Sequence, residues 1–142
     1  GKTGHDKTME IDLDGAIKSI NQAEKNGVKR FVMVGASHSD DRSYWGKVDG
    51  MKPYYTAKHY ADLELKRSSL DYTILRPVLL TDDDEAGKVL MTENPDEVGS
   101  EIPRQAVAET VLAVLKDPKT YGKVIEMSKG EDTIADALAK VC

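Results

Sequence analysis

Apolar side chains recur along much of the chain at the spacing of amphipathic helices. Between about residues 9 and 26 they stand three and four positions apart, on one helical face: Leu13, Ala16, Ile17, Ile20 and Ala23. Comparable stripes predict helices over about 53–68, from Pro103 to about Val114, and over 133–141. The polar residues 1–7 predict a loop.

Between these stripes lie short apolar runs that are too brief for buried helices. They predict strands covered on both faces, at 30–35, 71–76 and 123–127, and residues 87–92 predict one arm of a small hairpin. Helices and strands therefore alternate. This order predicts an α/β fold, a partial Rossmann-like three-layer sandwich with a parallel sheet of about three strands and helices on both faces.

Composition narrows the classes of partner. The chain has 142 residues, which predicts a single domain over 1–142. Twenty basic and 25 acidic residues are interspersed, so no basic surface for nucleic acid is expected. No apolar run approaches the ~18 residues of a membrane span. The lone Cys142 favours a reducing cytoplasm.

Tyr54 and Lys58 are the residues with the clearest chemical potential. They stand four apart near the start of a predicted helix, so their side chains leave the same face. A phenol becomes a useful acid or base when a neighbouring cation favours its phenolate, and Lys58 is placed to be that cation. A packed tyrosine beside a surface lysine is the structural alternative.

Several stretches, taken in order, resemble the short-chain dehydrogenase/reductases, most closely their atypical and extended members in the NAD(P)-dependent epimerase/dehydratase group. The matching stretches are Asp12–Gly15, Val28–Val34, Tyr54–Lys58, Leu70–Pro77 and Ile102–Ala108. They cover nearly the whole chain in the family's order.

The resemblance implies a role for each matching position. Tyr54 would be the catalytic acid/base, and Lys58 its activator and a ligand of the cofactor ribose. Asp12 falls where extended members place an Asn that supports the lysine through water. An acid that compensates the helix dipole in a first turn is the structural alternative for Asp12. Arg76 and Pro77 would bring backbone against the nicotinamide carboxamide, with Val78 beside them.

Residues 35–37 depart from the family's pattern. The catalytic serine is expected as the second residue after the strand that ends at Val34, but Gly35 and Ala36 follow that strand and Ser37 comes one position late. Ser37 remains the candidate. Loss of one oxyanion donor costs about 10²–10³ in rate, so this departure bears directly on whether the protein is catalytic.

A second departure concerns the pyrophosphate. The family binds it on a GxxGxxG turn between its first strand and first helix, and the chain has no such turn. We therefore expect the C-terminal half of an NAD(P)-binding domain, with NAD or NADP bound by the complete protein and none by this chain.

These residues lead to one functional expectation and two alternatives. The parent protein would be an NAD(P)-dependent oxidoreductase or sugar-epimerase/dehydratase-like enzyme acting on a small carbonyl or hydroxyl substrate. The first alternative is a non-catalytic NAD(P)-sensing regulator of the same fold, and the second is an inactive truncated chain.

Two further expectations concern partners and metals. Without a neighbouring strand, the run at 30–35 would be an open edge, so we expect self-association through it, for instance as a dimer. No metal site is expected, because the three histidines and the acidic run Asp82–Glu85 lack ligand spacing.

Overall fold

The computed structural model describes residues 4–142, which form two compact units. The first unit contains the described residues up to 31 together with His38–Asp71, and the second contains Val32–Ser37 and Tyr72–Cys142. Helices dominate the first unit, and a sheet is the frame of the second. Within residues 4–142, no helix is long and apolar enough to cross a bilayer.

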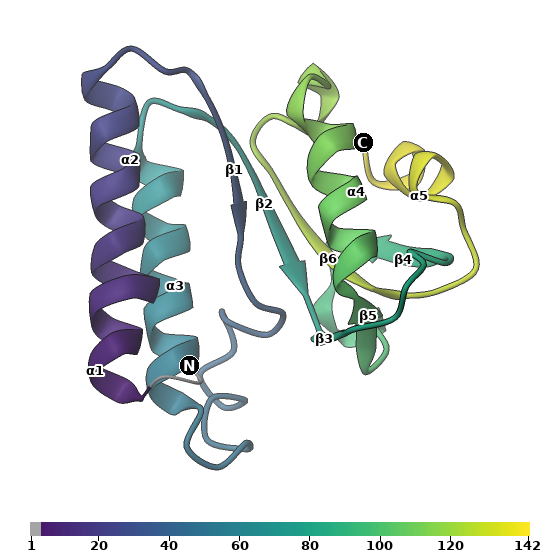
Figure 1. Cartoon of the computed structure of the whole chain (residues 1–142), viewed down its shortest axis with the longest axis horizontal. Helices are drawn as coiled ribbons and strands as arrows, with labels where there is room; N and C mark the ends of the chain where they lie inside the picture. The colour runs from purple at the N-terminus through teal and green to yellow at the C-terminus, as the bar shows by residue number, and fades with distance from the viewer. Residues whose placement is uncertain (1–3) are drawn as a thin grey trace. The chain divides into compact units, whose positions relative to one another are not determined.

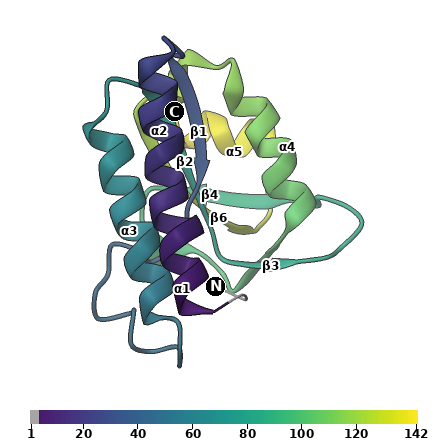
Figure 2. The same ribbon diagram turned by 60° about the vertical axis from the view of Figure 1, so that its left-hand side comes forward.

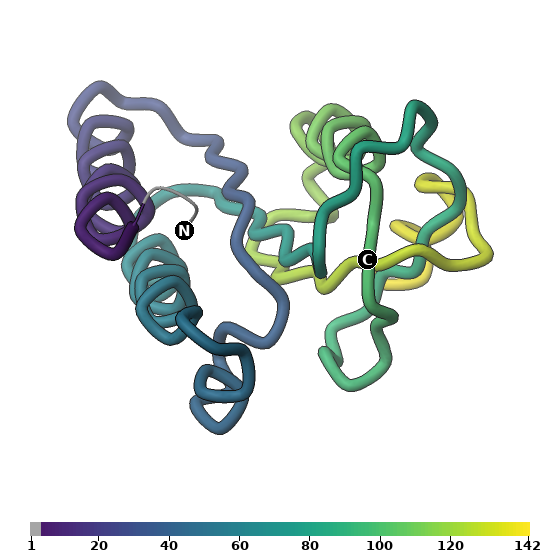
Figure 3. The backbone as a smooth tube through the Cα atoms, turned by 60° about the horizontal axis from the view of Figure 1, so that its bottom comes forward, coloured from purple at the N-terminus to yellow at the C-terminus, as the bar shows by residue number. Residues whose placement is uncertain are grey.

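Two helical columns lie side by side in the first unit (Figures 1, 2 and 3). One is continuous and consists of α1 (His5–Lys7), the π-helix η1 (Thr8–Gly15) and α2 (Ala16–Lys25). The helix predicted over 9–26 is thus confirmed, but it begins earlier. The predicted loop is wrong at His5–Lys7, and residues 1–3 of that loop lie outside the described residues.

The second column is α3 (Lys52–Arg67), which confirms the helix predicted over 53–68. Pro53 stands in its first turn, where a missing N–H costs no helical hydrogen bond. Ala57, Ala61 and Leu65 follow four residues apart and are all buried. This buried stripe fixes which face of α3 turns inward and therefore where the remaining side chains of the helix point.

A mixed sheet of four strands forms the frame of the second unit, in the order β1 (Arg30–Val34), β2 (Asp71–Pro77), β6 (Lys123–Lys129), β4 (Val89–Thr92). Gly35 N–H donates to Leu75 C=O and Ser37 N–H donates to Pro77 C=O, a parallel progression from β1 to β2. β2 and β6 are also parallel. The α/β class and all three predicted strands are confirmed.

Strand β4 was not predicted correctly. Residues 87–92 form no local hairpin, because β4 pairs antiparallel with β6 and Val89 lies opposite Lys129. Gly130 permits this close pairing. A Cβ atom at Gly130 would lie 2.5 Å from the Leu90 nitrogen and 2.6 Å from the Val89 carbonyl carbon. The pairing of β4 with β6 therefore requires a glycine about forty positions along the chain.

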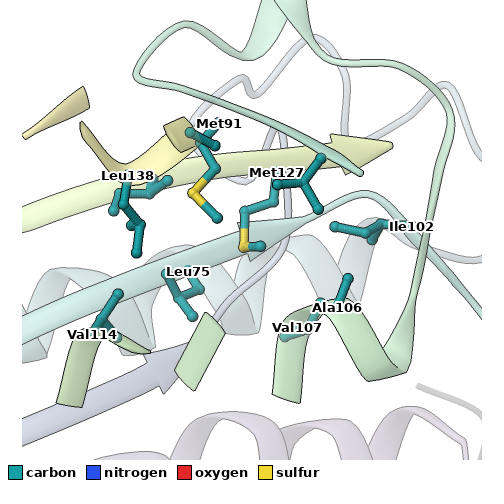
Figure 4. Packing of buried hydrophobic residues seen from close by; sticks show 11 residues of the cluster. Leu75, Met91, Ile102, Ala106, Val107, Val114, Met127 and Leu138 are labelled. Atoms are coloured by element: carbon teal, nitrogen blue, oxygen red, sulfur yellow. The ribbon is translucent and has the colours of Figure 1, made fainter. Parts of the chain in front are cut away.

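One face of the sheet carries the apolar core of the second unit (Figure 4). Leu75, Ile125 and Met127 from the strands pack with side chains of α4 (Arg104–Leu115) and α5 (Ile134–Val141). Both helices confirm the sequence prediction. The remaining short elements are the parallel pair β3 (Leu79–Thr81) and β5 (Glu101–Pro103), and the 3₁₀ turns η2 (Pro95–Glu97) and η3 (Pro118–Thr120).

We propose that the chain self-associates through β1, which is one of the two edge strands of its sheet within residues 4–142. Its residues Phe31–Val34 contain no charge or proline to blunt the edge. At micromolar concentration the chain should sediment as a species heavier than its 15.6 kDa monomer. Val34 is 37% exposed, so a lysine there can extend into solvent, and Val34→Lys should restore the monomer.

Leu112→Lys is the matched control, because Leu112 is 73% exposed on α4, away from this strand, and its substitution should leave the association intact. A wild-type chain that sediments as a monomer would show that the β1 edge does not recruit a partner.

Candidate functional site

Tyr54 and Lys58 lie together on α3 in the first unit. Tyr54 occupies the first turn, and Lys58 follows one turn later, so both side chains leave the same face. The Lys58 Nζ atom lies 5.6 Å from the centroid of the Tyr54 ring. Both residues are partly buried. The pairing that the sequence spacing suggested therefore exists as a contact of the ammonium group with the ring face.

Asp12 reaches the same tyrosine from η1, the π-helical segment, which packs against α3 in the first unit. The negative charge of Asp12 acts on the Tyr54 hydroxyl. π-helical turns are rare and are enriched at functional sites, so the irregular segment is itself informative. The structure thus brings together three of the predicted residues, Asp12, Tyr54 and Lys58.

Burial raises the pKa of Tyr54 above the ordinary value of a phenol, and the charges of Asp12 and Asp62 raise it further. The sequence suggested that Lys58 would favour the phenolate. In this structure burial and the two acids instead move the pKa upward. Tyr54 is therefore protonated at neutral pH and is equipped to donate a proton.

Asp62 is a residue of this site that sequence reasoning missed. It lies on α3, four residues after Lys58 and eight after Tyr54, and it is only 1% exposed. A carboxylate is rarely buried so completely without a specific role. The repeat of four residues places Asp62 on the same helical line as Tyr54 and Lys58, but the sequence does not show that Asp62 is buried.

An aromatic cluster extends from Tyr54 along the loop that precedes α3. Tyr55 packs edge-on against both Tyr54 and Tyr44, and His38 stacks on Tyr44 at 4.3 Å. Burial and a hydrogen bond with Tyr44 raise the pKa of Tyr55 to about 12. His38 has a positive φ of 64°, an unusual conformation for a residue with a side chain.

Two contacts hold this loop to its own unit. The Trp45 indole N–H donates to the Ser39 carbonyl at 2.9 Å, and the Nδ1 atom of His59 on α3 lies 3.0 Å from Asp40 Oδ1. The loop that leads into the Tyr54 helix is therefore anchored by a buried tryptophan.

Ser37, Arg76, Pro77 and Val78 belong to the second unit. Ser37 is 5% exposed, and its N–H donates to Pro77 C=O at 3.0 Å. The Val78 N–H donates to Met127 C=O at 3.1 Å. These backbone groups of the predicted nicotinamide contact are thus engaged within the sheet.

Arg76 forms a buried pair with Glu126. The two residues lie opposite each other on the parallel strands β2 and β6, and Arg76 Nη1 lies 3.9 Å from Glu126 Oε1. Their side chains are 6% and 2% exposed. The Arg76 guanidinium therefore pairs with a carboxylate of the neighbouring strand, on the sheet face opposite Leu75 and Ile125.

No group of three or more histidine, cysteine or acidic side chains is arranged to hold a metal ion in the part of the chain that the structure describes.

Comparison with known proteins identifies the family. A sequence profile described as NAD(P)H-binding matches residues 1–118. The chain belongs to this NAD(P)H-binding family. An "Uncharacterized sugar epimerase YhfK" of Bacillus subtilis is 42% identical over 141 residues, which is 99% of this chain and 64% of that protein.

Two solved structures support the same family. One, named "Putative NAD-dependent epimerase/dehydratase from Bacillus halodurans", is 41% identical with a TM-score of 0.91, and the match covers 97% of this chain and 64% of that one. The oxidoreductase ylbE from Lactococcus lactis is 36% identical with a TM-score of 0.87, over 94% of this chain and 61% of that one. The chain thus spans less than two thirds of the length of these relatives.

Replacing Asp12 with asparagine should lower the pKa of Tyr54, because the substitution removes one of the two negative charges that raise it. The phenolate absorbance of Tyr54 in an alkaline titration, isolated by subtracting the Tyr54→Phe titration, measures the change. Asp14→Asn is the matched control, since Asp14 is exposed and pairs with Lys18 at 2.8 Å. Equal titration curves for Asp12→Asn and the wild type would contradict this electrostatic account.

Proposed function

We propose that the chain supplies the proton-transfer residues of an NAD(P)-dependent oxidoreductase or epimerase/dehydratase-like enzyme that acts on a small carbonyl or hydroxyl compound. The observation that carries this proposal is the contact of the Lys58 ammonium group with the Tyr54 ring at 5.6 Å, in a chain of an NAD(P)H-binding family.

Tyr54 performs the proton step in this proposal. Its raised pKa keeps the phenol protonated, so the O–H donates to the substrate carbonyl oxygen as negative charge develops there. Lys58 then stabilises the phenolate that remains, because its ammonium charge lies against the same ring. The nicotinamide, when bound, supplies or accepts the hydride.

The residues of this chain fit only part of a dinucleotide. The partly buried ammonium group of Lys58 can donate to ribose hydroxyls. The Val78 N–H and the Pro77 C=O are engaged with Met127 and Ser37, and the sequence contains no GxxGxxG turn for the pyrophosphate. The chain would therefore contact NAD or NADP at the nicotinamide-ribose end.

Titration calorimetry tests whether this chain contacts only one end of the dinucleotide. The 142-residue chain should bind NADH and NADPH no tighter than about millimolar, roughly −4 kcal/mol, because no helix N-terminus in a glycine-rich turn neutralises the pyrophosphate. Micromolar affinity for either nucleotide would contradict the expectation and would reveal a pyrophosphate site elsewhere in the chain.

Gly35 and Ala36 favour a second candidate function. They occupy the positions where the resemblance implies the catalytic serine, and neither carries a hydroxyl. A protein without that oxyanion donor suits an NAD(P)-sensing regulator that binds the nucleotide without turning it over.

Tyr54→Phe separates the two functions in the protein expressed from its complete gene. With a panel of small aldehydes, ketones and keto-sugars, oxidation of NADPH or NADH should fall by about 10²–10⁴-fold, because the general acid is lost. Tyr60→Phe is the matched control, since Tyr60 lies on the same helix and is 42% exposed.

A variant Tyr54→Phe that keeps full activity would exclude Tyr54 as the proton donor. Nucleotide binding by the wild type without turnover of any member of the panel would favour the regulator.

A further inference from the structure

Asp62 is the most deeply buried carboxylate of the first unit that the structure describes, at 1% exposure. It lies in the third turn of α3, one turn beyond Lys58. Because residues four apart on a helix are neighbours on its surface, Tyr54, Lys58 and Asp62 form one line along the helix. Lys58, which carries the ammonium group, is the middle residue of that line.

A buried carboxylate requires compensation by cations or hydrogen-bond donors. Two other basic side chains of α3 have a different acidic partner. His59 Nδ1 lies 3.0 Å and Lys66 Nζ 3.8 Å from the carboxylate of Asp40. Lys58, like Lys66, stands four residues from Asp62, and the negative charge of Asp62 acts on the same phenol that the Lys58 ammonium group contacts.

We propose that Asp62 is a positioning residue, whose buried carboxylate holds the Lys58 ammonium group against the Tyr54 ring. The inference rests on the proposed roles of Tyr54 and Lys58. A lysine stem is flexible and its strongly hydrated head turns to water when nothing retains it. Asp62 lies inside the unit, so its attraction opposes that motion and keeps the cation one turn from the phenol.

The position of the Lys58 side chain is measurable without substrate or cofactor. In the chain labelled with [ε-¹³C]lysine, the resonance of Lys58 is the one that disappears in Lys58→Arg. The ring current of Tyr54 should displace its ε-proton shift, and Tyr54→Leu should abolish that displacement. Asp62→Asn should abolish it as well, Asp62→Glu should restore part of it, and the control Glu64→Gln should leave it unchanged, because Glu64 lies on another face of α3.

A folded Asp62→Asn chain that retains the full ring-current displacement overturns the proposal. If Asp62→Asn does not fold, the double variant Asp62→Asn/Lys58→Met decides the question. Removing both members of a buried pair relieves the uncompensated charge, so the double variant should fold and melt cooperatively where Asp62→Asn does not. A double variant that also fails to fold overturns the proposal. The Lys58 ε-proton shift is measured without turnover. A failure of Asp62 to position Lys58 can therefore be distinguished from a failure of the proposed activity.

Discussion

The repeat of four residues along α3 is the constraint on which the site depends. Because a helix brings residues four apart onto one line, the burial of Ala57, Ala61 and Leu65 also determines where Tyr54, Lys58 and Asp62 point. A shift of one position in this pattern would turn the buried line outward and change the direction in which the phenol and its lysine point. The chemistry of the first unit is thus a consequence of how one helix is packed.

The charges and burial around Tyr54 then determine how its phenol can act in proton transfer. Burial raises the pKa of Tyr54 and two carboxylates raise it further, while a single ammonium group lies on its ring. These surroundings keep the phenol protonated, so it can act as an acid in this state. Lys58 matters most after the proton has left, because the phenolate is the form that its charge stabilises.

Local patterns predicted most of this structure, and long-range packing accounts for what they missed. The stripes and apolar runs located the longer helices and the strands β1, β2 and β6, and the YxxxK spacing located Tyr54 and Lys58. Nothing local distinguishes the buried Asp62 from the acids on exposed helix faces, since its burial depends on packing of the first unit. Likewise, the pairing of Val89 with Lys129 and of Arg76 with Glu126 joins segments remote in sequence, and only the folded sheet reveals it.

The central claim is that the surroundings of Tyr54 keep its phenol protonated before proton transfer, and that Lys58 stabilises the phenolate afterwards. The most direct measurement is the titration of Tyr54 by the ¹³Cζ shift of labelled tyrosine, with its resonance identified by its loss in Tyr54→Phe. Burial and the charges of Asp12 and Asp62 predict a midpoint above the ordinary pKa of 10.0. A midpoint well below that value would show that Lys58 controls the phenol from the start and would contradict the account.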